Sequence, residues 1–404
     1  MPLSTTDFET NTPRAISRRS SDSSNSLAAS IALRAGLDWT QVPVGNIRDE
    51  HERRRAQERA ADAADAAPCR SLVDVCERAL RLEGYNVPRS DEDLIRSAVS
   101  TATLQHAFTD SINAIVSSAF DDAPDTTGWC EEVEVSSFKE QTDITLTPSR
   151  GMTKIGRGGT APHVTLGDRG EAFKIARYAE QFILDEMDII DDRFDLLTTV
   201  PDLMAQEAAR LRPDLVYSLL LANPTLGEDA KAVFHADHGN LAGSGSALAA
   251  AALQTALTAM GSQRDNNVPL NIRGRHLIVP PDLTFTGRQL VSSAEVRGDG
   301  AANGTRNPLQ DESLQVVAED RIGTSGVTSP DTGITYTGSS TNWFLAGSRR
   351  TIGVAFLRGT NRRPIVRQSS LQQGRWGLAA DVKFDIAAYA RDFRGLYKAT
   401  GEAA

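Results

Sequence analysis

The longest helical pattern in the chain lies within residues 183–240, and it constrains the fold more than any other stretch. From Met204 the apolar residues recur in steps of three and four, as one buried face of a helix requires: Ala208, Leu211, Leu215, Leu219 and Ala222. Pro201 and Asp202 are typical of a helix start, because proline fits the first turn and an acid there faces the positive end of the helix dipole. Asn223 and Pro224 are typical of its end. Since Pro213 removes a backbone donor, we predict one long helix, kinked between Ala209 and Pro213.

A compact polar motif follows this helix: Phe234-His-Ala-Asp-His-Gly-Asn-Leu241. Imidazole and carboxylate are standard metal ligands, so His235, Asp237 and His238 suggest a metal site. The chain has only 6 histidines, however, and no second cluster has matching spacing. The three residues are also too close in sequence to enclose a metal ion by themselves. We therefore predict no metal, and expect His235, Asp237, His238 and Asn240 to hold a turn by hydrogen bonds.

Composition limits the class of protein. A chain of 404 residues predicts two or three domain-sized units, and 40% hydrophobic residues suffice for a buried core. No run approaches the roughly 18 apolar residues of a membrane span, and the first residues lack the apolar segment of a secretory signal. We expect no membrane association and no export. Three cysteines, Cys69, Cys76 and Cys130, fit a reducing cytoplasm.

The first part of the chain is polar. Residues 1–46 are rich in Ser, Thr, Asn and Arg, so we predict that they are disordered or loosely attached. Residues 46–67 favour a helix with almost no apolar face, which is typical of a solvent-bridging helix, an exposed coil or a transient scaffold. We therefore expect residues 1–67 to add little to the core. Residues 71–82 form an amphipathic helix ended by Gly84, and residues 91–120 contain further short helices.

From Glu131 the pattern changes to the alternation of β-strands. Apolar residues alternate with polar ones on both sides of a Gly-rich segment, first at Val133, Val135, Ile144 and Leu146, then at Val164, Leu166, Phe173, Ile175 and Tyr178. This pattern predicts a long β-hairpin. It has too few apolar residues for a core of its own, so we expect it to rest on an adjacent subunit. Further on we predict helices over 246–260 and 282–294 and strands over 275–279, 314–317, 341–345, 352–357 and 377–389.

Two charged clusters are candidate contact sites. The Gly-rich tip of the hairpin carries Arg150, Lys154 and Arg157, and it lacks the helix and lysine pattern of a phosphate loop. The approach to the long helix carries a run of acids: Asp185, Glu186, Asp188, Asp191, Asp192 and Asp195. This run lacks the ligand spacing and central glycine of an EF-hand. We interpret it as a charged surface, and predict that the tip of one subunit lies over the acidic run of its neighbour.

The order of these features resembles a known family. A long helix, the Phe234–Leu241 motif, a small-residue helix ending in Met260-Gly-Ser-Gln263, and His276-Leu-Ile-Val-Pro-Pro-Asp-Leu283 resemble the major capsid protein of tailed bacteriophages and Mu-like prophages. The resemblance extends from about Arg70 to the C-terminus. It implies an α+β fold of the Hong Kong 97 type, with an N-terminal arm, an extended hairpin loop, a peripheral domain built on the long helix, and an axial domain.

The resemblance also implies a division of the chain and a function. The expected segments are an extension (1–70, scaffolding-like), the arm (71–130), the hairpin (131–180), the peripheral domain (181–222), the axial domain (223–358) and a return to the peripheral domain (359–404). Copies of the chain would assemble as hexamers and pentamers into an icosahedral shell around double-stranded DNA, with portal, scaffolding or prohead protease proteins as further partners. The expected location is the virion, assembled in the host cytoplasm, with no catalytic residues and no cofactor.

Charge and two alternatives bear on this interpretation. The net charge of −10 argues against a dedicated DNA-binding module, but it suits a container, because a strongly cationic wall would hold the phosphates of the genome. An encapsulin-like nanocompartment would use the same fold without DNA, and the long N-terminal extension favours the phage. A metal-dependent hydrolase built on the His235–His238 cluster is the enzymatic alternative, and it lacks a second acid, base or ligand set.

Overall fold

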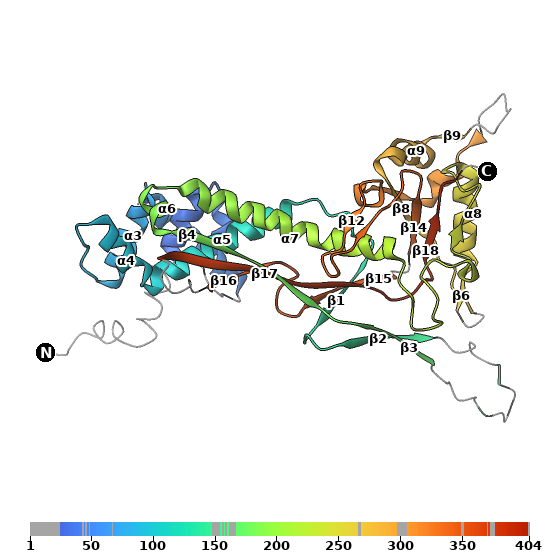
Figure 1. Ribbon diagram of the computed structural model, residues 1–404, viewed down its shortest axis with the longest axis horizontal. Helices are drawn as coiled ribbons and strands as arrows, with labels where there is room; N and C mark the ends of the chain where they lie inside the picture. Colours follow the sequence, from blue (N-terminus) through green and yellow to red (C-terminus); the bar gives the residue numbers. More distant parts are fainter. Residues whose placement is uncertain are drawn as a thin grey trace. The chain divides into compact units, whose positions relative to one another are not determined.

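The computed structural model divides into two compact units (Figure 1). Unit 1 consists of residues within Met1–Ala123, Arg177–Ala209 and Thr360–Phe384, and unit 2 of those within Pro124–Ala176, Arg210–Gly359 and Asp385–Ala404. The structure describes residues 25–42, 44, 47, 49–66, 68–147, 154–155, 157, 160, 167–265, 268–296, 305–348, 351–369, 371 and 376–402.

Unit 1 is mainly helical. Residues 25–34 are helical, and the chain continues through η2 (Trp39–Gln41), α2 (Glu50–Ala66), α3 (Leu72–Glu83), α4 (Asp91–Val99), α5 (Ala102–Asp122), α6 (Glu186–Ile190) and the first part of α7 (Phe194–Ala222). The predicted α3 is confirmed: the Ser71 hydroxyl accepts from the Asp74 N–H, and Gly84 ends the helix at φ 80°. Strand β17 (Gly377–Ala390) pairs with β16 (Ile365–Ser369) and with β4 (Ala176–Asp185).

The core of unit 1 includes residues that the sequence placed outside it. Leu27 is 0% exposed and Ile31 is 2% exposed, and both pack in one cluster with residues of α3, α4 and α5. The prediction that residues 1–67 add little to the core is therefore wrong for this helical segment. The helix α2 forms as predicted, but three of its alanines, Ala60, Ala61 and Ala64, are buried. Ala60 and Ala64 pack against Val42 and Ala29 in a separate cluster. Small residues there make a face that a hydrophobicity pattern does not detect.

The long helix α7 spans 29 residues, Phe194–Ala222. It begins seven residues before the predicted start at Pro201, because Phe194, Leu197 and Met204 are all buried in the core of unit 1 and their burial outweighs the backbone donor that proline lacks. Its end is as predicted. Asn223 adopts φ 49° and its N–H donates to the Leu219 carbonyl at 3.2 Å, which closes the last turn.

Unit 2 contains a mixed five-stranded sheet in the order β11-β8-β14-β18-β5. Its strands are β5 (Leu241–Ala242), β8 (Gly274–Val279), β11 (Gln315–Ala318), β14 (Trp343–Gly347) and β18 (Leu396–Ala399), with the helices α8 (Ala250–Gly261) and α9 (Pro281–Ser292). One face of the sheet buries Leu277, Trp343, Leu345 and Tyr397 against α8 residues such as Leu253. The predicted strand at 275–279 is confirmed. The next helix begins at Pro281, with Pro280 rather than Asp282 at its N-cap.

A second sheet joins strands that are distant in sequence. β15 (Ile352–Leu357) pairs in parallel with β1 (Glu131–Val135) and antiparallel with residues 386–390 of β17. The hairpin itself consists of β2 (Gln141–Thr147) and β3 (Gly167–Phe173). The predicted hairpin was therefore too long at its base, since Val133 and Val135 lie in β1, and Tyr178 lies in β4. Alternation shows that a segment is a strand but does not show which strand it pairs with.

Shorter elements complete unit 2. They are η3 (Ala236–His238), β6 (Arg264–Asp265), β7 (Val268–Pro269), β9 (Glu295–Val296), β10 (Thr305–Arg306), η4 (Pro308–Glu312), η5 (Asp320–Ile322), β12 (Val327–Thr328) and β13 (Thr335–Tyr336). The chain thus mixes helices with largely antiparallel pairing, and the α+β class is confirmed. Among the described helices none is both long enough and apolar enough to span a membrane.

The burial of Leu27 leads to a stability prediction. Leu27→Ala should destabilise the protein by about 2–5 kcal/mol, since a fully buried leucine leaves a cavity. Leu82→Ala, at a leucine of α3 that is 43% exposed, is the control and should cost much less. Denaturant unfolding followed by far-ultraviolet circular dichroism measures both. Equal unfolding midpoints for Leu27→Ala and the wild type would show that the N-terminal helix does not belong to the core.

Candidate functional site

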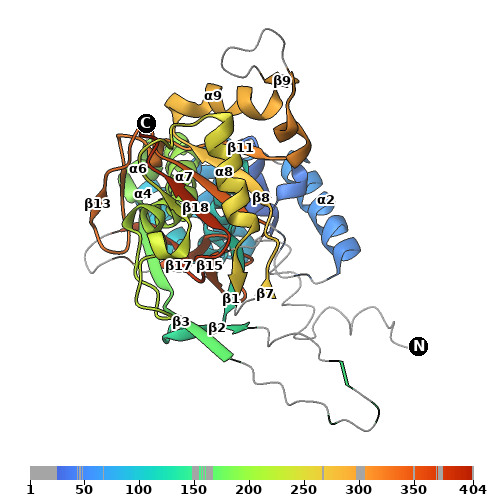
Figure 2. The same cartoon turned by 90° about the vertical axis from the view of Figure 1, so that its right-hand side faces the viewer.

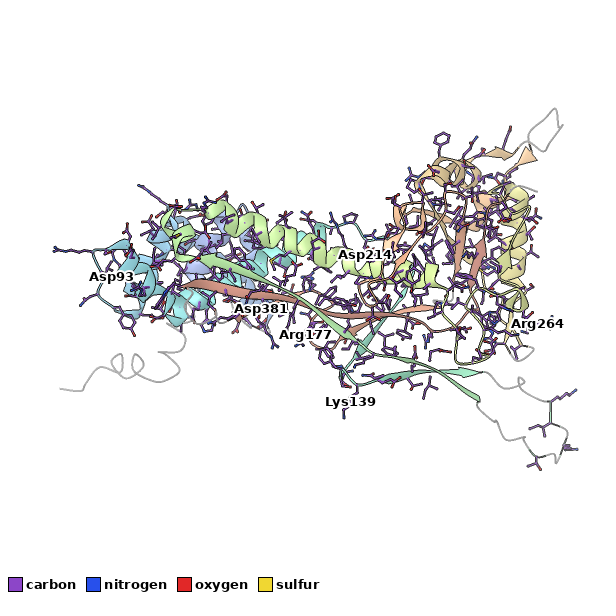
Figure 3. All side chains as sticks on the ribbon, in the orientation of Figure 1. Asp93, Lys139, Arg177, Asp214, Arg264 and Asp381 are labelled. Atoms are coloured by element: carbon purple, nitrogen blue, oxygen red, sulfur yellow. The ribbon has the colours of Figure 1, made fainter. Side chains whose placement is uncertain are left out.

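The hairpin β2–β3 forms a two-stranded sheet that no other described strand joins. Its ladder runs from Gln141 opposite Phe173 to Thr147 opposite Gly167. In Figures 1 and 2 it lies below β1 and β15, and Figure 3 marks Lys139 just before β2. Ile144 in the middle of β2 is 54% exposed. An isolated two-stranded ribbon is only marginally stable in water, so the position of this hairpin depends on the contacts at its base.

Two aromatic rings hold that base. The rings of Phe173 on β3 and Tyr389 on β17 stack with centroids 4.0 Å apart and planes 4° apart. The Tyr389 hydroxyl donates to Asp143 Oδ2 on β2 at 2.7 Å, so one tyrosine contacts both arms of the hairpin. Gly353 on β15 makes room for the tyrosine, because a Cβ there would lie 2.5 Å from the ring. We call Phe173, Tyr389 and Asp143, with Arg391, the hairpin clamp.

Electrostatics reinforce the hairpin clamp. Arg391 Nε lies 3.0 Å from Asp143 Oδ2, and its Nη1 donates to Glu131 on β1. Burial, together with the hydrogen bond to Asp143, raises the pKa of the Tyr389 hydroxyl. The phenol therefore remains a donor at neutral pH, and the Asp143 carboxyl group accepts between Tyr389 and Arg391. Such charge-assisted bonds are stronger than neutral ones.

A second attachment ties β3 to the loop after α7. The carboxylate of Glu171 accepts from the Gly227 N–H at 2.8 Å and from the Glu228 N–H at 3.3 Å. With Phe173 and Ile175 in a buried cluster of unit 2, the base of the hairpin rests on its own unit. The expectation that the hairpin must rest on an adjacent subunit is thus wrong for its base, because local alternation could not show the partner side chains on β15 and β17.

The structure describes two of the three basic residues at the hairpin tip. Lys154 and Arg157 are exposed. Arg150 lies outside the described residues. The contact of this tip with a neighbouring subunit stays a prediction.

The acidic run before α7 has roles inside unit 1. The Asp185 side chain caps α6 by accepting from the Glu186 N–H at 2.7 Å, and Asp188 completes this capping box. Asp192 accepts from the Leu72 N–H at 2.7 Å and lies 3.7 Å from Arg34. Asp191 and Asp195 are exposed. The run is therefore partly a set of helix caps, a role that capping signals in the sequence could have revealed.

The Phe234–Leu241 motif forms a hydrogen-bonded turn. The Asn240 amide donates to the Val233 carbonyl at 2.8 Å, and its oxygen accepts from the His235 N–H at 3.1 Å. His238 lies 2.7 Å from Asp229 through Nε2 and 3.2 Å from the Val233 carbonyl through Nδ1. Its ring stacks on Phe393 at 3.7 Å. The side chains of Asn240 and His238 thus stabilise this turn by hydrogen bonds to the backbone and to Asp229.

The remaining polar groups of the motif are also paired. Asp237 lies 2.6 Å from Lys231 Nζ, and this hydrogen bond lowers the pKa of Asp237 and raises that of Lys231. Burial opposes ionisation of Asp229, but the hydrogen bonds from His238 and the Lys231 N–H lower its pKa. Within the part of the chain that the structure describes, no group of three His, Cys, Asp or Glu side chains could hold a metal ion.

Sequence reasoning missed the ion pairs that hold the second half of α7. Arg212 lies 2.8 Å from Glu132 and 3.4 Å from Asp125. Two residues further on, Asp214, marked in Figure 3, lies 2.5 Å from Arg321, which also reaches Glu319 at 2.9 Å. The partners are about 80 to 107 positions apart in sequence. No local spacing could have identified them.

A family model described as phage capsid protein matches residues 170–399, from the second arm of the hairpin to β18. This match covers more than half of the chain. The chain belongs to the phage capsid protein family.

Solved structures give looser likenesses to this capsid protein. A phage-related protein from Bordetella bronchiseptica is 13% identical, covering 71% of this chain and 96% of that one at a TM-score of 0.42. The capsid of Myoviridae phage XM1 is 11% identical, covering 68% and 90% at 0.42. The SrpI encapsulin from Synechococcus elongatus is 11% identical, covering 68% and 85% at 0.41. No curated protein matches the chain.

The family match confirms the resemblance found in the sequence. The protein is a phage capsid protein, and so a structural component of the virion shell. A shell component contacts its neighbours through its surfaces, so surfaces are its candidate functional sites. The hairpin, with its base clamped on unit 2, is the first of these surfaces.

The hairpin clamp predicts a local change in dynamics. Tyr389→Phe keeps the stack on Phe173 but removes the donor to Asp143, which should cost about 1.5–3 kcal/mol for a bond to a charged group. Amide hydrogen exchange in β2 and β3 should accelerate more than in β14. Tyr397→Phe, at a buried tyrosine of β18, is the control. Unchanged exchange in the hairpin of Tyr389→Phe would show that the clamp does not fix it.

Proposed function

We propose that copies of this capsid protein assemble as hexamers and pentamers into an icosahedral phage shell that encloses double-stranded DNA. The observation that supports this most is the family match over residues 170–399. The chain would be assembled in the host cytoplasm, with portal, scaffolding or prohead protease proteins as partners. It would act through its surfaces alone, without catalysis and without a cofactor.

The exposed apolar side chains support this role. Large apolar residues are exposed on several elements: Ile144 on β2 (54%), Met187 on α6 (76%), Leu203 on α7 (53%) and Phe285 on α9 (80%). Single exposed apolar side chains are common on protein surfaces, and only contiguous patches mark one large interface. These four lie on separate elements, which would suit a subunit that makes many modest contacts rather than one large one.

Electron microscopy of the expressed full-length chain tests the proposed function. We expect closed shells of uniform size, either from the chain alone or with its scaffolding and portal partners. Particles from infected or induced cells should contain DNA that resists added nuclease. Closed shells that never protect DNA would favour a nanocompartment, and a chain that remains monomeric under all these conditions would contradict a shell function.

The tip of the hairpin is the second part of the proposal. We propose that Arg150, Lys154 and Arg157 of one subunit lie over the acidic run of a neighbour. Asp191 and Asp195 are exposed there, whereas Asp185, Asp188 and Asp192 also serve as caps. One exposed ion pair contributes only about 0.2–1 kcal/mol, but the contact would recur at each subunit of a shell.

Replacing Arg150, Lys154 and Arg157 together by Glu should lower the yield of shells and leave the unfolding temperature unchanged. Salt should partly restore assembly by screening the new repulsion. The matched control replaces the exposed arginines Arg54, Arg55 and Arg59 of α2 by Glu, which changes the net charge equally. Sedimentation velocity compares the two. Normal shells from the tip variant at low ionic strength would contradict the contact.

A further inference from the structure

The outward face of α9 carries the most exposed large apolar side chain among the described residues. Phe285 is 80% exposed. Gly287 marks the opposite, inward face, because a Cβ there would lie 3.4 Å from Val316 and 3.7 Å from Leu277. Residues two positions apart are separated by roughly 200° around a helix. Because Gly287 faces inward, Phe285 points away from the unit. Asp282 precedes it by about one turn and Arg288 follows it by about one turn, and both are exposed.

A groove of ≈ 990 Å³ lies elsewhere on unit 2, between α8, the start of β8 and η4. Leu257 of α8 and Leu309 of η4 contribute apolar lining. Arg273 and Arg275, which are both exposed, contribute positive charge to the lining. Asp311 and Glu312 contribute negative charge from η4. The groove lining thus combines bases, apolar groups and acids, and Asp311 among the acids also pairs with Arg306 at 2.8 Å.

The outward face of α9 carries chemistry that matches the groove. Asp282, Phe285 and Arg288 present an acid, a large apolar group and a base along one helix, where the groove offers bases, leucines and acids. In both Figure 1 and Figure 2, α9 lies above α8. The Asn307 amide at the start of η4 donates to the carbonyls of Leu290 at 2.7 Å and Ser293 at 2.9 Å, which ties η4 to the end of α9. The outward face of α9 is therefore fixed relative to the groove and cannot enter the groove of its own chain.

We propose that the α8–η4 groove binds the α9 face of a second copy of this chain, with Phe285 inserted beside Leu257. Asp282 then faces Arg273 and Arg275, and Arg288 faces Glu312. A contact between two different surfaces of identical chains is heterologous, and it forms a closed ring when the rotation between copies allows closure. The contact rests on the proposed function, since it needs a self-assembling chain, and it assigns the residues that join neighbours within a ring.

Engineered cysteines test this contact directly. The native cysteines Cys69, Cys76 and Cys130 are all buried, so an added surface pair can be oxidised selectively. The test variant combines Phe285→Cys with Gln254→Cys, an exposed residue in the groove lining. Non-reducing electrophoresis of oxidised assemblies should show a ladder of covalent oligomers that ends at five or six chains. Each single variant should give monomers.

The control pair joins Phe285→Cys to Ile334→Cys, an exposed position outside the groove. It should give no ladder. Shells of normal form without a ladder from the Phe285–Gln254 pair would overturn the α9 contact while leaving the shell function in place. Covalent dimers from Phe285→Cys alone would also overturn it, because the face would then pair with itself. A wild-type chain that never assembles would contradict both the contact and the shell function.

A second variant separates assembly from folding. Phe285→Asp should lower the shell yield at least tenfold, whereas Phe285→Leu should assemble nearly as the wild type does. Both should keep the wild-type unfolding temperature, because the side chain is 80% exposed. Normal assembly of Phe285→Asp would overturn the proposed insertion.

Discussion

The long helix α7 supplies buried side chains to both units of this capsid protein, so its two parts must each fit a separate core. The first turns of α7 bury Phe194, Leu197 and Met204 in unit 1. Its later turns bury Val216, Tyr217 and Leu220, and the Tyr217 hydroxyl donates to the Thr126 carbonyl of unit 2 at 3.0 Å. Two prolines inside the helix are tolerated because both halves are fixed by packing, which contributes more than helix propensity does.

The surfaces proposed for assembly are attached to this frame in different ways. The hairpin is held at its base by the stack of Phe173 on Tyr389, and its Ile144, Lys154 and Arg157 are exposed. The outward face of α9 and the α8–η4 groove are rigid, because a helix carries one and a buried sheet supports the other. A shell built from such surfaces needs no single strong interface, since each modest contact is repeated in every copy.

The sequence predicted the features that depend on local patterns. Asn223 after Ala222, Gly84 after α3 and the strand at β8 all follow from capping, turn and strand signals in consecutive residues. The family was also predictable from the order of such features. The predictions that were wrong concern features that depend on distant partners. Pro201 hid the true start of α7, whose first turns are buried in the core of unit 1, and the burial of Leu27 depends on helices α3 to α5. The hairpin clamp joins residues 246 positions apart.

The central claim is that the hairpin stands on its own unit and extends to a neighbour within a shell. A cryo-electron microscopy reconstruction of assembled particles, at a resolution that shows side chains, tests this most directly. The account predicts Tyr389 stacked on Phe173 of the same chain, with β2 and β3 lying on another copy. A hairpin that folds back on its own chain, or whose base is held by a neighbour's side chains, would contradict it.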